Sequence, residues 1–103
     1  MASDKEYLEY VLDQMSDLAD VAYRPMMGEY VLYYRGKVIG GIYDDRLLLK
    51  PTPSVRALLA DAPLVRPYEG AGEMVYANPD EKDLLQRVIA VMWDELPTPK
   101  KKK

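Results

Sequence analysis

The chain lacks the two side chains that most often carry out chemistry near neutral pH. Its 103 residues include no cysteine and no histidine. A thiolate nucleophile, a disulfide, a thiolate metal site and an imidazole base are therefore all excluded. Ser16 and Ser54 have no partner base at a recognisable spacing. We expect no catalytic residue, no cofactor and no enzymatic activity; an enzyme or small-ligand domain built on buried carboxylates is the least favoured alternative.

Paired carboxylates are the next candidates for chemistry. Asp44 and Asp45 could supply half of a metal site, but Ca²⁺ and Mg²⁺ need several converging oxygens. The chain has no calcium-loop spacing around this pair. A two-residue hairpin turn is the better interpretation, and we expect no metal site.

Tyrosines and basic residues alternate through the middle of the chain and could form a surface that stacks nucleic-acid bases. They are Tyr23, Tyr30, Tyr33, Tyr34, Tyr43, Arg35, Lys37, Arg46 and Lys50. However, residues 1–99 hold ten basic and 17 acidic side chains, a net charge of −7. Phosphate affinity depends on Lys and Arg, while tyrosine also suits strands and protein interfaces. We therefore expect these tyrosines and basic residues to serve in the core and in a protein interface. Nucleic-acid binding through these strands remains the alternative.

The two ends of the chain indicate its organisation. The length suits one domain, which we place at 1–96, followed by a disordered basic tail at 97–103 that contains four lysines. The tail is a second candidate for nucleic-acid or anionic-membrane contact, although a solvated end is the simpler interpretation. The polar N-terminus and the lack of an apolar run of about 20 residues predict a cytoplasmic protein with no membrane partner.

The opening segment predicts an amphipathic helix over about 4–16. Ser3 and Glu6 have the spacing of a capping box, in which each side chain bonds the backbone of the other. Apolar residues then recur at helical spacing, with acids on the opposite face. These residues are Tyr7, Leu8, Val11, Leu12, Met15 and Leu18.

Short β-prone segments follow, and the turns between them are too short for crossover connections, so an antiparallel meander is expected. The segments span 21–25, 30–34, 37–43 and 46–50. Arg35-Gly36 is typical of a hairpin turn. Gly40-Gly41 lies within a strand and indicates a bulge or a close approach by another backbone. Leu48 shares a strand face with Arg46 and Lys50, and we expect this face to be half exposed or covered by a partner.

The second half of the chain alternates helices and short strands. Thr52-Pro53 predicts a short helix to about residue 59. Residues 61–72 are expected to form a loop with an optional strand near 64–66. Residues 74–77 are expected to form a last strand. Asn78-Pro79 predicts the start of a final helix, with Asn78 as its cap. These patterns predict an α+β fold of two layers: a mainly antiparallel sheet of about five strands with helices packed on one face.

Two stretches of the chain together resemble the signature of a known family. Residues 24–36 and 42–50 resemble the N-terminal domain of the TfoX/Sxy competence regulators. That signature runs Arg, any residue, Met-Phe-Gly-Gly, any residue, Gly-Leu-Tyr, followed by an Asp-containing turn and a Leu-x-Leu-Lys strand. The resemblance covers about residues 3–96. Met27, Glu29 and Val31 stand where the signature has Phe, Gly and Gly.

The resemblance implies a function as well as a fold. The competence regulators carry a second, helical domain and act with the cyclic-AMP receptor protein, whereas this chain corresponds to the first domain alone. The resemblance therefore implies a stand-alone, non-enzymatic regulatory module that binds another protein, and does not extend to control of competence. The family fold is similar to secretion-chaperone-like α/β domains, which often dimerise, so a homodimer through the strand region is also expected. We predict that partner contacts involve Arg24, Met27, Tyr30, Tyr33, Arg35, Arg46 and Lys50.

Overall fold

The computed structural model describes residues 4–96, so the capping role predicted for Ser3 and the tail predicted at 97–103 lie outside the described residues. Helix α1 spans Lys5–Gln14, which confirms the amphipathic helix at a slightly shorter length. Its N-cap is Asp4, whose carboxylate accepts a hydrogen bond from the backbone N–H of Glu6 at 2.9 Å. The cap therefore lies one residue later than the capping-box pattern suggested.

The predicted meander is present, and each of its three connections has two central residues with positive φ. Its strands are β1 (Val21–Met26), β2 (Glu29–Tyr34), β3 (Lys37–Ile42) and β4 (Leu47–Leu49). The turns are Met27-Gly28, Arg35-Gly36 and Asp44-Asp45. Positive φ at both positions is the type I′ geometry that matches the twist of a β-hairpin. The turns predicted at Arg35-Gly36 and Asp44-Asp45 are confirmed, and Met27-Gly28 is an additional one.

The remaining elements occur in the predicted order. They are α2 (Pro53–Leu58), β5 (Leu64–Val65), β6 (Met74–Tyr76), α3 (Lys82–Met92) and a 3₁₀ turn, η1 (Trp93–Glu95). Thr52 caps α2 as predicted, because its hydroxyl accepts from the backbone N–H of Val55 at 3.4 Å.

The predicted start of the last helix is wrong. The side-chain oxygen of Asn78 accepts from the backbone N–H of Asp80 at 2.9 Å and forms a local turn. The carbonyl of Pro79 accepts from the side-chain amide of Gln14 at 2.8 Å, which ties this turn to α1. Helix α3 therefore begins only after Glu81.

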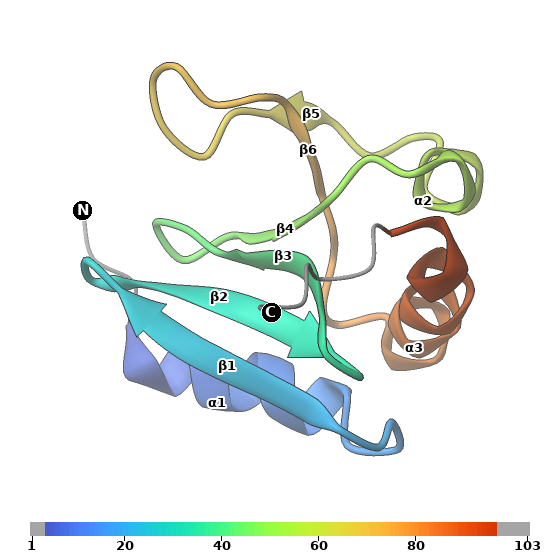
Figure 1. Cartoon of the computed structure of the whole chain (residues 1–103), viewed down its shortest axis with the longest axis horizontal. Helices are drawn as coiled ribbons and strands as arrows, with labels where there is room; N and C mark the ends of the chain where they lie inside the picture. The colour runs from blue at the N-terminus through green and yellow to red at the C-terminus, as the bar shows by residue number, and fades with distance from the viewer. Residues whose placement is uncertain (1–3, 97–103) are drawn as a thin grey trace, which may run out of the picture.

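The strands form one antiparallel sheet in the order β1-β2-β3-β4-β6-β5 (Figure 1). The α+β class and the two-layer arrangement are confirmed. The sheet has six strands instead of about five, because residues 64–65 pair with β6. Figure 1 also shows that the β1–β2 turn, the β3–β4 turn and the β5–β6 loop extend to the same side of the molecule.

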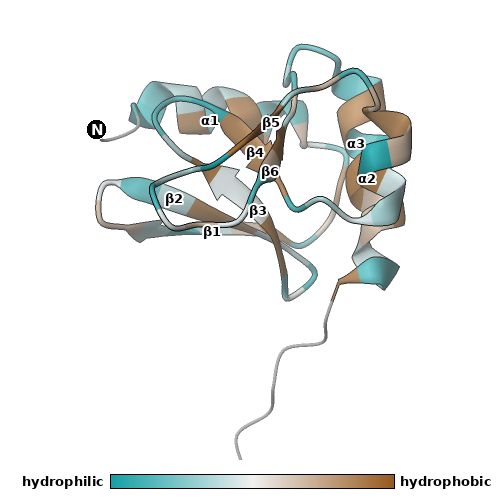
Figure 2. Cartoon of the chain, turned by 90° about the horizontal axis from the view of Figure 1, so that it is seen from above, coloured by the Kyte–Doolittle hydropathy of each residue, from teal (hydrophilic) through white to brown (hydrophobic). Residues whose placement is uncertain are grey.

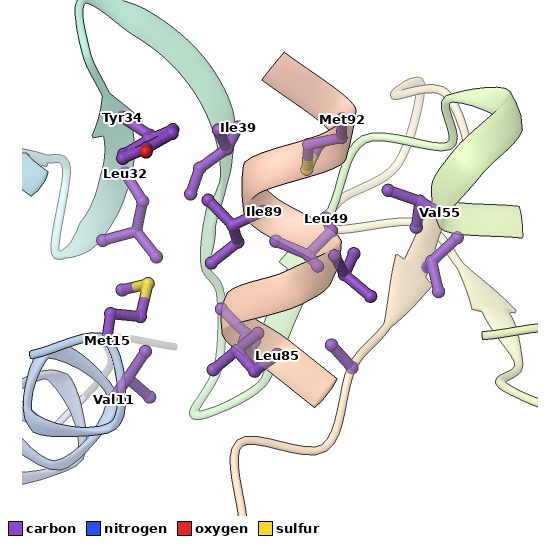
Figure 3. Close-up of a cluster of buried hydrophobic side chains, with 14 of the residues drawn as sticks. Val11, Met15, Leu32, Tyr34, Ile39, Leu49, Val55, Leu85, Ile89 and Met92 are labelled. Carbon is purple, nitrogen blue, oxygen red and sulfur yellow. The ribbon is translucent and has the colours of Figure 1, made fainter. Parts of the chain in front are cut away.

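The core lies between the helices and one face of the sheet. Val11 of α1 and Met15, the C-cap of that helix, face Leu32 and Tyr34 of β2, and α3 packs beside them (Figure 3). Hydrophobic stretches of helices and strands meet in the middle of the molecule (Figure 2). We call this side of the sheet the core face and the opposite side the outer face.

Gly40 allows strand β4 to approach β3, and Gly41 allows the backbone of β2 and the ring of Tyr43 to approach. A Cβ atom on Gly40 would collide with the carbonyl oxygen of Leu48, and one on Gly41 would lie 2.7 Å from a ring carbon of Tyr43. The pairing of β2 with β3 shifts register between Leu32 and Tyr33, opposite this segment. Both the bulge and the close approach predicted from the glycine pair are confirmed.

Leu48 differs from the expectation that its face would be half exposed or covered by a partner. It pairs with Gly41 and so lies on the outer face, yet it is fully buried within this chain. The ring of Tyr43 lies against Gly41 on the same face. This part of the outer face is therefore covered by the chain itself.

Candidate interaction surface

Strand pairing determines which predicted contact residues lie on the outer face. Cross-strand partners in an antiparallel pair point to the same side of a sheet. Arg24 pairs with Val31, Val31 with Gly41, and Gly41 with Leu48, which makes all of them outer-face residues. Tyr33 alternates with Leu32 and also lies on this face.

The three connections that extend to one side of the molecule enclose a hollow of about 540 Å³. Its lining residues are Met26, Met27, Glu29, Tyr43, Asp44, Arg46, Pro67 and Tyr68. Two of the predicted contact residues, Met27 and Arg46, are among them. The hollow is therefore built by segments that are distant in sequence, namely the first hairpin, the β3–β4 turn and the β5–β6 loop.

A second hollow of about 370 Å³ continues from the first along the outer face. It shares Tyr43, Pro67 and Tyr68 with the first, and its other lining residues include Lys50 and Met74. Lys50 is a third predicted contact residue. We call the two hollows together the outer groove.

Large apolar side chains are unusually exposed along the outer groove. Met27 is 97% exposed, Tyr68 is 61% exposed and Met26 is 42% exposed. Single exposed hydrophobic residues are common, but a cluster around a concave surface is typical of binding surfaces. Met27 lies at the tip of a two-residue turn.

Hydrogen bonds hold the polar part of the groove in place. A carboxylate oxygen of Glu29 accepts from the backbone N–H of Asp44 at 3.1 Å, which links the first and third hairpins. The Nε–H of Arg46 donates to the carbonyl of Tyr43 at 3.2 Å. Asp45 instead accepts from the backbone N–H of Asp4 at 2.7 Å and so connects the same turn to α1.

Tyr43 lies at the centre of the groove. Its ring centroid is 6.2 Å from that of Tyr68, with the two planes tilted by 54°. Burial raises the pKa of the Tyr43 hydroxyl above its ordinary value, and Tyr68 and the charge of Glu29 raise it further. The hydroxyl therefore stays protonated and can act as a hydrogen-bond donor at neutral pH.

Four predicted contact residues do not line the groove. Arg24 and Tyr33 lie elsewhere on the outer face, and the other two lie off that face. Tyr30 belongs to the core face, where it pairs with Ile42 and makes an edge-to-face contact with Tyr23 at 5.8 Å. Arg35 lies in the β2–β3 turn, and its guanidinium carbon is 5.4 Å from the centroid of the Trp93 ring. Arg35 is exposed, as expected for a turn residue, whereas Tyr30 is half-buried. Strand alternation separates the two faces of β2 but does not say which of them is buried.

Sequence reasoning also missed several groove residues. Met26, Tyr43, Pro67 and Tyr68 line the outer groove but were not singled out as contacts. A signal was available for Tyr68, since an aromatic residue in a loop rich in Pro and Gly has little core to pack against. Nothing local placed that loop beside the β3–β4 turn.

The remaining features of the described residues concern metal ligands, buried polar atoms and a further hollow. Within residues 4–96, no group of three or more His, Cys, Asp or Glu side chains could hold a metal ion. Every buried side-chain nitrogen and oxygen in this part of the chain has a hydrogen-bond partner. A further hollow of about 440 Å³ lies between the end of α2 and the β6–α3 connection, and Tyr76 is its one large side chain that is both apolar and clearly exposed.

Among residues 4–96, every helix is too short or too polar to span a membrane.

In comparisons with known proteins, the family model of the TfoX N-terminal domain matches residues 13–87. An uncharacterized 12.7 kDa protein encoded in the trpE 5′ region of Spirochaeta aurantia is 36% identical over 105 residues, which cover 100% of this chain and 91% of that protein. No solved structure matches the chain.

Proposed function

Because the chain belongs to the TfoX N-terminal domain family, we propose that it is a non-catalytic regulatory module that binds a partner protein in the outer groove. The observation that carries this proposal is the cluster of exposed Met26, Met27 and Tyr68 around the larger hollow. Methionine adapts its shape to a bound surface, and aromatic residues are enriched at the centres of protein interfaces.

The form of the groove also favours a macromolecular partner. It runs from the β1–β2 turn to the β5–β6 loop and is open to solvent at its mouth, where charged Glu29, Arg46 and Lys50 surround the apolar wall. Interfaces commonly combine an apolar centre with a polar rim. Rigid two-residue turns hold two of the three walls, so little ordering is needed when the partner binds.

The nucleic-acid alternative has weaker support. Tyr30 and Tyr34 lie on the core face, and Arg35 and Lys37 are engaged with Trp93. The tyrosines and bases of the middle strands are thus divided between two faces. No specific observation favours this function over protein binding, and anisotropy with single-stranded and duplex oligonucleotides at low salt tests it.

The experiment that tests the proposal is affinity capture from the native cell with groove variants. Tyr68→Ser and Met27→Asn remove apolar surface from the groove, and Asn tolerates the positive φ at position 27. Val91→Gln on α3 is the matched control, since Val91 is also an exposed apolar residue. Partners retained by the wild type and the control but lost by both groove variants support the proposal. Partners retained by all four proteins contradict it.

A further inference from the structure

The chemistry of the outer groove indicates what kind of segment it binds, an inference that rests on the proposed function. The walls of the larger hollow combine the thioether chains of Met26 and Met27 with the rings of Tyr43 and Tyr68. Two carboxylates, Glu29 and Asp44, lie at the same hollow. A ligand that fits must therefore offer an apolar stem together with a positively charged end.

Two tyrosine rings line the larger hollow together. The centroids of Tyr43 and Tyr68 are 6.2 Å apart, so one charge held in the hollow can lie within reach of both rings. Cations within about 6 Å of a tyrosine centroid are attracted by the ring quadrupole. Glu29 lines the same hollow as Tyr43, so its carboxylate lies close enough to contribute to the binding of a cation there.

The charge balance of the site also favours a cation. Two acids and one base, Arg46, line the larger hollow. Groups of both signs also bond the backbone: the Nε–H of Arg46 donates to the carbonyl of Tyr43, and Glu29 accepts from the N–H of Asp44. The smaller hollow adds one base and one acid, Lys50 and Glu73. Residues 4–96 carry a net charge of −7, and a field of this sign attracts positive partners from a distance.

The length of the groove distinguishes a chain segment from a compact ligand. Both hollows share Tyr43, Pro67 and Tyr68, so a ligand that passes Tyr68 contacts both. The smaller hollow has apolar walls in Val38, Pro51 and Met74. We propose that the groove binds an extended, lysine-bearing segment of a partner protein, with a lysine side chain in the larger hollow and neighbouring apolar residues along the smaller one.

The test uses fluorescence anisotropy of the full chain with labelled peptides. The probes are an extended peptide of alanine and proline that carries three lysines, and two versions in which glutamine or glutamate replaces lysine. We expect the lysine peptide to bind about tenfold more tightly than the glutamine peptide, the glutamate peptide to bind most weakly, and salt to reduce the difference.

Variants show whether the effect is local. Glu29→Gln and Asp44→Asn remove groove charges while keeping an acceptor oxygen and, at position 44, a residue that tolerates positive φ. Glu9→Gln is the control, because Glu9 is an exposed acid on α1 and its loss changes the net charge equally. The proposal requires the lysine preference to fall several-fold in both groove variants and to persist in the control.

Three outcomes would overturn this inference. The first is equal binding of the lysine and glutamine peptides. The second is a loss of lysine preference in Glu9→Gln as large as that in the groove variants. The third is binding of free 1,5-diaminopentane as tight as that of the lysine peptide. If any of these occurs while partner capture remains sensitive to Tyr68→Ser, the lysine specificity is wrong and the proposed function stands. If capture is insensitive to the groove variants, the proposed function itself fails.

Discussion

The ammonium group of Lys37 lies 3.9 Å from the centroid of the Trp93 ring and donates hydrogen bonds to the carbonyls of Trp93 and Leu96, each at 3.0 Å. Trp93 is the C-cap of α3 and Leu96 is the C-cap of η1, so both carbonyls lie at helix C-termini, where a positive charge is favourable. The indole N–H of Trp93 in turn donates to the carbonyl of Arg35 at 3.4 Å. The β2–β3 hairpin and the end of the last helix are therefore joined through one side chain of each.

Lys37→Met should destabilise the fold. The apolar stem is kept, but two carbonyls lose their charged donor and the ring loses its cation, so we expect the free energy of unfolding to fall by about 2 kcal/mol. Urea denaturation measures this loss. Trp93 is the only tryptophan, so its emission should also change in the folded variant. Lys5→Met, at an exposed position, should change stability by no more than about 0.5 kcal/mol; an equal loss there would contradict the role of Lys37.

Gly41→Ala should be strongly destabilising. The new Cβ would lie 2.5 Å from the carbonyl oxygen of Tyr30 and 2.7 Å from the Tyr43 ring, so the strands must separate. We expect a loss of about 2–4 kcal/mol in urea denaturation. Gly72→Ala is the matched control, since a Cβ there meets nothing within 4 Å. Similar midpoints for the two variants would show that the packing of Tyr43 over β3 is wrong.

Glu95 should make stability depend on pH. The side-chain hydroxyl and then the backbone N–H of Ser54 hydrogen-bond the carboxylate and lower the pKa of Glu95 below its ordinary value of 4.5. A lowered pKa in the folded state means that this stabilisation is complete above about pH 4.5 and is lost as the pH falls through the folded value. The unfolding midpoint of Glu95→Gln should therefore lie below that of the wild type near pH 6 and approach it near pH 3.

Ser54→Ala provides the internal check for Glu95. If the two residues act through their mutual hydrogen bond, the double variant should lose less stability than the sum of the single losses. Strict additivity, or a difference between wild type and Glu95→Gln that does not change with pH, would contradict the proposed coupling.

Pro25 should protect the open edge of the sheet. In an antiparallel pair, hydrogen-bonded and non-hydrogen-bonded residue pairs alternate along the strands. The two-residue turn at Met27-Gly28 makes Met26 and Glu29 a hydrogen-bonded pair. The bond from the N–H of Arg35 to the carbonyl of Asp20 fits the same pattern at the other end of β1. The backbone groups of Tyr23 and Pro25 consequently point to the open edge, where proline offers no N–H to a second sheet. The predicted homodimer, if it pairs two β1 edges, must form without this donor.

Pro25→Thr should therefore increase self-association, because it restores a donor and a β-prone residue at an exposed edge. Light scattering over a dilution series measures the mass of both proteins. We expect the variant to shift to larger species at concentrations where the wild type does not. Masses that agree at every concentration would show that proline is not what limits edge pairing, and a wild type that stays monomeric throughout would contradict the homodimer.

The order of helices and strands could be predicted from the sequence because it depends on neighbouring residues. Alternation, helical spacing and residues such as Gly36 that favour positive φ act within a few positions of the chain. The same local logic identified Asp44-Asp45 as a turn and Gly40-Gly41 as a bulge. It failed at Asn78, because the carbonyl of Pro79 bonds a side chain of α1, which is 65 residues away.

The outer groove required the tertiary structure. It forms only because β4 pairs with β6, which brings Tyr68 beside Tyr43 and the Met27 turn. Alternation already places Tyr30 and Tyr33 on opposite faces of β2, but only the packing of α1 and α3 shows that the face of Tyr30 is buried. From the sequence alone, Lys37 is indistinguishable from a surface charge. Only the tertiary structure places its ammonium group against the carbonyls of Trp93 and Leu96 and the ring of Trp93. Short-range preferences thus set the elements of this chain, and contacts between distant segments set its binding surface.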